Sequence, residues 1–288
     1  MPNWMQRLEA RWMRRYSGPP KALAGDAGRR PVTVITGGNE GIGRALAREF
    51  AATGHELMLV ARDRDRLEQT ADALRRDFGV VVHIAAIDLA VPDASDQLDA
   101  ALDSAGLYAD YLVNNAGFGL AGAFVQQDVG LLTQLVGLNV RVLTDLTRRH
   151  LPDMLARARG GVLNIGSIGG LLPGPYLAVY YASKAYVVSL TEALAYENAG
   201  RGVRICVAMP GPIATRFHEK MGTSGANYLK LQTVMTPEAA ARVIYSGFMG
   251  RRTVIAPGVL ATFNFAVVGF IPHFILVPFI GWFLKQRY

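Results

Sequence analysis

The chain has 288 residues, of which 51% are hydrophobic and 18% charged, with 31 glycines, 14 prolines and one cysteine. This composition excludes a disordered chain, a disulfide-stapled secreted module and a collagen-like fibre, and the length suits one α/β domain of roughly 250 residues. The net charge of +7 is concentrated at the ends, +5 in residues 1–30 and +4 in residues 251–288, so the body has no excess of basic residues for nucleic acid, and the ends favour an anionic membrane surface.

Residues 1–30 form a basic, amphipathic N-terminal extension. Trp4, Leu8, Trp12 and Tyr16 recur at helical spacing among four arginines, and a Ser-Gly-Pro-Pro sequence then ends the pattern. The stretch lacks the long apolar core of a secretory signal. An interfacial helix on a membrane and a helix packed on the body or on a partner are equally open interpretations. A mitochondrial presequence is a weaker alternative, because serine is scarce in this stretch.

Residues 31–257 alternate between apolar, β-rich runs and stretches of helical periodicity. The expected helices are Ile42–Ala52, Arg64–Phe78, Thr133–Ala156 and one that starts at Pro237 with Thr236 as its N-cap. The expected strands are Val32–Thr36, Glu56–Ala61, Val80–Ile87, Tyr111–Asn114, Gly161–Ile165, Val203–Met209 and Thr253–Ala256. This alternation predicts an α/β fold with a single doubly wound parallel sheet and helices on both faces.

The single cysteine, Cys206, lies inside one of the expected strands and cannot form an internal disulfide. It is therefore expected to be a buried core residue, and the chain is expected to be cytoplasmic, since free thiols are usual in reducing compartments.

Residues 258–288 form an apolar C-terminal tail. Val259–Leu284 is long enough to cross a bilayer, which takes about 20 apolar residues, but two glycines and two prolines interrupt it. The tail can bury its surface in a bilayer, against a partner subunit or in a cleft of its own domain. The interruptions favour a bent, partly inserted element at the cytoplasmic face of a membrane over a straight span.

A glycine-rich segment follows the first expected strand and opens a helix, with the sequence Thr36-Gly37-Gly38-Asn39-Glu40-Gly41-Ile42-Gly43. Gly37 permits a tight turn, and Gly41 and Gly43 let the backbone approach a phosphate and the helix pack closely on the strand. The helix N-terminus offers unpaired N–H groups to a pyrophosphate. The segment predicts a dinucleotide site, with a purely structural turn as the alternative.

Further motifs follow the later strands in order, namely Asp88-Leu89, Asn114-Asn115-Ala116-Gly117, Asn139, Ser167, Tyr180-Tyr181-Ala182-Ser183-Lys184 and Pro210-Gly211-Pro212-Ile213-Ala214-Thr215. Together with the Gly-x-x-x-Gly-x-Gly spacing, they resemble the short-chain dehydrogenase/reductase family over residues 31–257. The resemblance implies a Rossmann-type fold and a dinucleotide held by Thr36, Gly37, Asn39, Glu40, Gly41, Ile42, Gly43, Arg62, Asp88, Leu89, Asn115, Ala116, Gly117, Tyr180, Lys184, Pro210, Gly211, Ile213 and Thr215.

The catalytic group that the resemblance implies consists of Asn139, Ser167, Tyr180 and Lys184. Tyr180 and Lys184 are four residues apart and lie on one helix face, where an ammonium group lowers the pKa of a tyrosine from about 10. Such a tyrosine can exchange a proton with an alkoxide, and Ser167 can hold the carbonyl oxygen. The family implies a water relay through Asn139. Tyr181 is the neighbouring alternative to Tyr180 but does not fit the motif register.

Cofactor choice depends on the residues after the second strand. An acid there would accept the ribose hydroxyls of NAD, whereas this chain has Ala61 followed by Arg62, and arginine pairs with a 2′-phosphate. NADP(H) is therefore favoured. Asp63 next to Arg62 opposes this choice, and so does Glu40, which stands where some relatives have a basic residue.

The sequence predicts an NADP(H)-dependent oxidoreductase that interconverts a carbonyl and a secondary alcohol. The segment 212–235, where the family has its substrate loop, holds Phe217, Met221, Tyr228 and Leu231, which indicates a small lipophilic carbonyl substrate of steroid, acyl or sphingoid type, as in membrane-associated members of the family. The alternative is a non-catalytic NADP(H)-binding scaffold at a membrane. No Cys/His cluster has metal-ligand spacing. The family implies a homo-oligomer formed by helices near 133–156 and 180–199.

Overall fold

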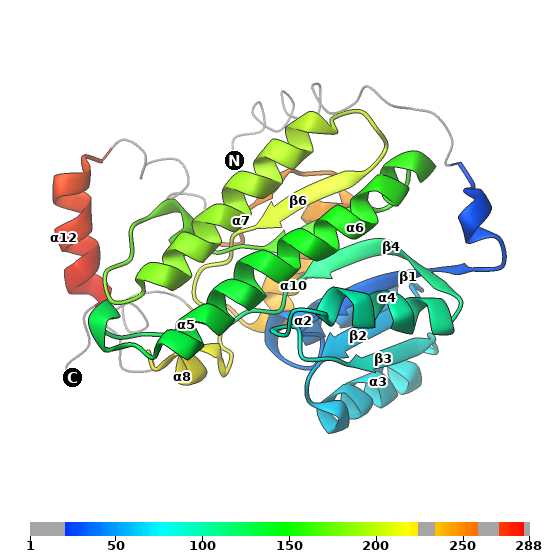
Figure 1. Cartoon of the computed structure of the whole chain (residues 1–288), viewed down its shortest axis with the longest axis horizontal. Helices are drawn as coiled ribbons and strands as arrows, with labels where there is room; N and C mark the ends of the chain where they lie inside the picture. Colours follow the sequence, from blue (N-terminus) through cyan, green and yellow to red (C-terminus); the bar gives the residue numbers. More distant parts are fainter. Residues whose placement is uncertain (1–20, 224–233, 259–270, 285–288) are drawn as a thin grey trace.

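The structure is a computed structural model that describes residues 21–223, 234–258 and 271–284 (Figure 1). The predicted N-terminal helix up to Tyr16, the substrate-loop residues Tyr228 and Leu231, and the first part of the tail lie outside the described residues.

A seven-stranded parallel sheet in the order β3-β2-β1-β4-β5-β6-β7 lies at the centre. The strands are β1 Arg30–Thr36, β2 Leu57–Ala61, β3 Val82–Ala86, β4 Leu107–Asn114, β5 Gly161–Ile165, β6 Arg204–Ala208 and β7 Val254–Ile255. Every expected strand is confirmed. Because the strand order reverses between β1 and β4, the crevice at their carboxyl ends is where ligands bind in such sheets.

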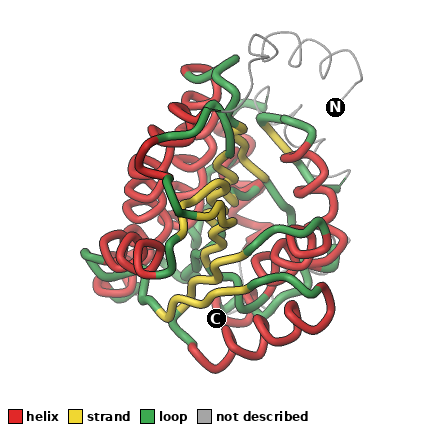
Figure 2. The backbone as a smooth tube through the Cα atoms, turned by 90° about the vertical axis from the view of Figure 1, so that its right-hand side faces the viewer, coloured by secondary structure: helices red, strands yellow, loops and turns green. Residues whose placement is uncertain are grey.

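Helices cover both faces of the sheet, as Figure 2 shows from the side. On one face lie α2 Gly41–Ala52, α3 Arg64–Phe78 and α10 Pro237–Met249, and on the other lie α4 Ala94–Ser104, α5 Val129–Val136, α6 Val142–Arg157 and α7 Ala178–Glu197. Each face has its own apolar core, one around Phe50 and Phe248 and the other around Leu98 and Leu146. The predicted doubly wound α/β fold is confirmed.

The helix expected at Thr133–Ala156 begins earlier and contains a π turn. Asp128 caps its start by accepting a hydrogen bond from the amide of Leu131, and the π turn Gly137–Arg141 (η3) joins α5 to α6. By length and composition this stretch, Val129–Arg157, is the one helix among the described residues that could cross a membrane. It packs on β4 and β5, as a core helix does. A π turn inside a helix is often found at a functional site.

The cap predicted at Thr236 is confirmed, because its side chain accepts a hydrogen bond from the amide of Ala239 at 3.2 Å. In contrast, α4 was not expected. It is rich in alanine and aspartate, and only Leu98 and Leu102 anchor it in the core as large apolar side chains.

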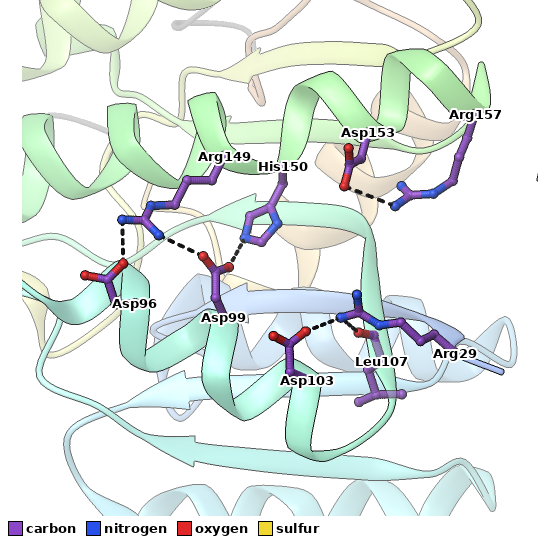
Figure 3. A network of polar contacts seen from close by, with 9 residues as sticks. All are labelled: Arg29, Asp96, Asp99, Asp103, Leu107, Arg149, His150, Asp153 and Arg157. Carbon is purple, nitrogen blue, oxygen red and sulfur yellow. Dashed lines mark hydrogen bonds and ion pairs between the residues drawn. The ribbon is translucent and has the colours of Figure 1, made fainter. Parts of the chain in front are cut away.

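Ion pairs join α4 to α6 on one face of the sheet (Figure 3). Arg149 of α6 bridges Asp96 at 2.7 Å and Asp99 at 2.8 Å. Next to it, the buried Arg157 pairs with Asp26 at 2.6 Å, which ties the segment before β1 to the body. The remaining helices, α8 Phe217–Met221 and α12 His273–Leu284, lie beyond the carboxyl ends of the strands.

Candidate active site

The glycine-rich turn between β1 and α2 is held against the end of β4. The Thr36 hydroxyl accepts hydrogen bonds from the amides of Asn115 at 2.9 Å and Ala116 at 3.0 Å. In return, the Asn115 side chain donates to the carbonyls of Thr36 and Gly37. A Cβ at Gly43 would lie 2.2 Å from the Gly37 carbonyl oxygen, so only glycine fits there. The turn is therefore a rigid backbone cradle.

This cradle fits a pyrophosphate. The amides of the first turn of α2, at Gly41, Ile42 and Gly43, have no intrahelical acceptors, and the side chain of the N-cap residue Glu40 does not cap them. Gly41 has a positive φ of 55°, and a Cβ there would lie 3.3 Å from the Thr215 side chain. The helix N-terminus thus presents its N–H groups and positive dipole end to the cradle.

The charges around the end of β2 differ from the sequence expectation in one respect. Arg62 is 74% exposed, with its nearest guanidinium nitrogen 4.0 Å from Asp88. Glu40 is paired with Arg66 at 3.5 Å and with Lys220. Because two cations neutralise Glu40, this acid opposes a 2′-phosphate less than its position in the sequence suggests. Arg66 and Lys220 were not identified from the sequence.

A cleft of about 330 Å³ opens beside the same turn. Asn39 and Glu40 form one side of it, and Arg44, Arg66 and Arg216 contribute three guanidinium groups. Because this cleft has more cationic than acidic side chains, it is suited to an anionic ligand.

Tyr180 and Lys184 lie on one face of α7, and both are buried. The Lys184 ammonium nitrogen lies 5.9 Å from the centre of the Tyr180 ring and donates a hydrogen bond to the Ile165 carbonyl at 2.8 Å. Burial lowers the pKa of Lys184 to about 8. A cation this close to the tyrosine favours its phenolate form.

Asn139 lies at the π turn and is fully buried, and its side chain forms hydrogen bonds with two other segments of the protein. It accepts a hydrogen bond from the amide of Phe118 and donates to the Phe118 carbonyl and to the Ser183 hydroxyl. Ser183 in turn donates to the Tyr180 carbonyl at 2.7 Å. A Cβ at Gly117 would lie 2.9 Å from Asn139 Oδ1 and 3.7 Å from Lys184 Nζ. Asn139 therefore joins the loop after β4 to the helix that carries Tyr180.

Ser167 follows β5 and caps the short helix η4 Ile168–Leu171, accepting a hydrogen bond from the Gly169 amide at 3.1 Å. Tyr181 occupies a different environment from Tyr180. Its ring packs directly over Gly169 and Gly174, where an added Cβ would collide with it. This packing role supports the choice of Tyr180 over Tyr181.

The remaining predicted residues lie along the same edge of the sheet. Leu89 and Ile213 are buried, Pro210 accepts a hydrogen bond from the Ile168 amide at 3.2 Å, and the Thr215 hydroxyl accepts one from the Phe217 amide at 3.3 Å. With Gly211 between them, these residues place the loop after β6 next to the loop after β5.

Apolar side chains surround Tyr180 on the side away from the cradle. The Phe217 ring lies 5.7 Å from the Tyr180 ring, and Met221 of α8 belongs to the same buried cluster. The tail helix α12 contributes its inner face to this cluster, through Leu276, Ile280 and Leu284. One face of the tail is thus buried on its own domain, which was one of the three possibilities open from the sequence.

The sequence profile of the short chain dehydrogenases matches residues 31–224. The chain belongs to this family. A curated relative, the mouse very-long-chain 3-oxoacyl-CoA reductase, is 33% identical over 188 residues, 64% of this chain. The match spans 60% of that relative, so the chain resembles part of a longer protein.

Solved short-chain dehydrogenase structures have the same fold. One from Sphingobium yanoikuyae in complex with NADPH has a TM-score of 0.73 and 30% identity, covering 84% of this chain and 96% of that one. The bulky-bulky ketone specific alcohol dehydrogenase from Comamonas testosteroni has a TM-score of 0.69 and 28% identity, covering 85% and 96%.

In this short-chain dehydrogenase, the residues that sequence reasoning missed are those that act across long distances in the chain. Lys220 reaches Glu40 from 180 positions away, and α12 reaches Tyr180 from the end of the described chain. Ser183 could have been found, because it lies inside the Tyr-x-Ala-Ser-Lys motif itself.

Proposed function

We propose that this chain is an NADP(H)-dependent oxidoreductase that reduces a lipophilic ketone of acyl type to a secondary alcohol. The observation that carries the proposal is the pairing of Tyr180 with a buried Lys184 one helical turn away. This pair lies between a backbone cradle suited to a pyrophosphate and a cluster of apolar side chains. The dinucleotide fits the cradle at Gly37, Gly41 and Gly43, and Arg62 is available to a 2′-phosphate.

Each catalytic residue has a distinct role in this proposal. A bound nicotinamide supplies the hydride. The Tyr180 hydroxyl donates a proton to the alkoxide oxygen as charge develops there, and the Lys184 ammonium stabilises the phenolate that remains. Ser167 donates a hydrogen bond to the carbonyl oxygen and orients it. Asn139 holds the loop after β4 against α7, which keeps Tyr180 and Lys184 in place.

The substrate class is inferred from the walls around Tyr180. Leu135, Met221, Leu276 and Ile280 are buried in one cluster with it, and such a surface excludes water from a long hydrocarbon chain. The name of the mouse relative, a very-long-chain 3-oxoacyl-CoA reductase, fits this chemistry. The bulky ketone named for the Comamonas testosteroni enzyme fits it as well.

We also propose a location and an oligomeric state for the enzyme. We place it in the cytoplasm, in agreement with the buried free thiol of Cys206, and we propose a homo-oligomer that pairs through α6 and α7.

The test is the oxidation of NADPH by the purified protein with 3-oxoacyl thioesters of increasing chain length, steroid ketones and small aldehydes. We expect turnover with the acyl ketones that increases with chain length, and little with small aldehydes. NADPH binding without turnover on any ketone would instead support the non-catalytic scaffold. Preference for small polar carbonyls would contradict the assigned substrate class.

A further inference from the structure

The tail helix α12 is apolar on all sides, yet only one side of it is buried. Its sequence, from His273 to Leu284, contains no Asp, Glu, Lys or Arg. Leu276, Ile280 and Leu284 face the cluster around Tyr180. On the opposite side, Phe274 is 80% exposed and Trp282 is 61% exposed. A helix that is hydrophobic all round is normally enclosed by protein or lipid, so its outer face requires a partner.

A second segment with exposed apolar side chains is connected to α12 through contacts at Pro175 and Tyr176. Gly281 of α12 lies against Pro175, since a Cβ there would be 3.5 Å from the proline ring. Tyr176 next to Pro175 accepts a hydrogen bond from the amide of Gly122, shortly before the helix η2. We use the name outer patch for the six exposed side chains of these two segments, Phe124, Val125, Phe274, Ile275, Phe279 and Trp282. Figure 1 shows α12 at the end of the molecule where α5 begins.

The charges near the outer patch indicate the kind of partner. No acidic residue follows Glu238 in the chain, and Lys285 and Arg287 come directly after α12. The twelve residues before Ile271 in the tail carry no charge. A stretch of sequence that is rich in aromatic residues, contains no acid and is followed by basic residues is typical of segments that lie at an anionic bilayer interface.

We propose that the outer patch docks this protein on an anionic lipid membrane, and that α12 is at the same time a wall of the substrate site. In this arrangement the helix lies in the plane of the interface, with Phe279 and Trp282 in the lipid and Ile280 against the Tyr180 cluster. The site then opens next to the bilayer, so a hydrocarbon chain reaches it without crossing water. The docking stands on the patch alone, whereas the delivery of substrate rests on the proposed function.

The experiment is flotation of the full-length protein with mixed phosphatidylcholine–phosphatidylglycerol vesicles and with pure phosphatidylcholine vesicles. The variant Phe279→Ser/Trp282→Ser removes the centre of the outer patch, and Val81→Ser/Val243→Ser, at two exposed apolar residues outside the patch and outside α6 and α7, is the matched control. We expect the wild type and the control to float with the anionic vesicles. The outer-patch variant should bind at least about tenfold more weakly, because it loses two large apolar side chains from the surface that enters the lipid. An unchanged melting temperature and NADPH affinity show that it remains folded.

A second measurement locates the contact. The chain has three tryptophans, so Trp4→Phe/Trp12→Phe leaves Trp282 as the one emitter. Its emission should shift to the blue with anionic vesicles and be quenched by brominated lipid. Flotation that persists in the outer-patch variant, together with an unshifted Trp282 emission in the single-tryptophan protein, would mean that another part of the chain binds lipid and would overturn the proposal. A wild-type dimer that the outer-patch substitutions convert to a monomer, without any vesicle binding, would overturn it in favour of a second copy as the partner. Loss of turnover alone leaves both measurements untouched, so a failure of the proposed function is distinguishable.

Discussion

The two sides of the site are built on different principles. On the cradle side, the Asn115 side chain is hydrogen-bonded to the backbone of Gly37. Gly43 packs so closely on the same turn that a Cβ there would collide with the Gly37 carbonyl oxygen. On the substrate side, Tyr180 is surrounded by apolar side chains from several separate segments, among them α8 and α12. On the proposed function, the first side would hold a cofactor of fixed shape, and the second would admit substrates of differing shape.

This difference has an energetic consequence. A hydrogen-bonded backbone cradle has one arrangement, and a substitution that displaces it loses the whole site. An apolar wall loses affinity in proportion to the area or volume removed. The two sides should therefore respond to mutation in different ways, abruptly on the cradle side and gradually on the substrate side.

The largest effect is expected where the two sides meet. Tyr180→Phe keeps the ring in its apolar cluster and removes the proton donor, so turnover should fall by about 10²-fold or more while NADPH still binds. The measurement is steady-state NADPH oxidation together with cofactor titration by fluorescence. Tyr181→Phe is the matched control and should retain most activity, because that ring packs on Gly169 and Gly174. Equal losses in both variants would refute the assignment of Tyr180.

Gly43→Ala tests how abruptly the cradle fails. The added methyl group would lie 2.2 Å from the Gly37 carbonyl oxygen and 2.4 Å from the Asn115 amide nitrogen, so the turn must shift. We expect about 1–3 kcal/mol of lost stability, as for overpacked sites, and a loss of cofactor affinity of similar size. Gly25→Ala is the control, because nothing lies within 4 Å of its added Cβ. Unchanged cofactor affinity in the Gly43 variant would contradict a rigid cradle.

Arg62→Ala tests cofactor selection on the same side. Only NADPH carries a 2′-phosphate, so its affinity should fall by about 1.5 kcal/mol while NADH is nearly unaffected. Isothermal titration with both cofactors measures the difference. Equal weakening of both would show that Arg62 supports the fold of the β2–α3 turn instead of reading the phosphate.

Much of the cradle side could be predicted from the sequence. Thr36 ends one strand, and Asn115 and Ser167 come after two others. Each of these strands can be recognised from its own short apolar run, and the carboxyl ends of parallel strands meet at one edge of the sheet. What could not be predicted was the pairing of Glu40 with Lys220, the hydrogen bond from the Asn139 side chain to Ser183, and the position of α12. Each of these depends on contacts between segments far apart in the chain, and the residue pattern of a short stretch of sequence does not reveal such contacts.

The buried cation of Lys184 links the two sides and has a consequence for pH. Its pKa in the folded protein is about 8, below the ordinary lysine value of 10.5, so the folded state binds fewer protons than the unfolded state between these values. The free energy of unfolding of the cofactor-free protein should therefore rise as the pH increases from about 8 towards 10. Lys184→Met should abolish this rise. Denaturant titrations of both proteins at pH 8 and at a higher pH measure it, and an identical pH response would contradict burial of the charge.

The smallest effect is expected at the apolar wall, where one helix offers its own control. Ile280 lies on the inner face of α12 in the Tyr180 cluster, whereas Ile275 lies on the outer face and is 53% exposed. Ile280→Val removes one buried methylene, which costs about 1 kcal/mol, so the KM for a long-chain 3-oxoacyl thioester should rise about fivefold with little change in kcat. Ile275→Val removes the same group from the outer face and should leave the KM unchanged for a substrate presented in solution. If both variants behave alike, α12 does not form part of the substrate wall. If the Ile280 variant instead loses activity with every substrate, the wall is as rigid as the cradle and the contrast between the two sides fails.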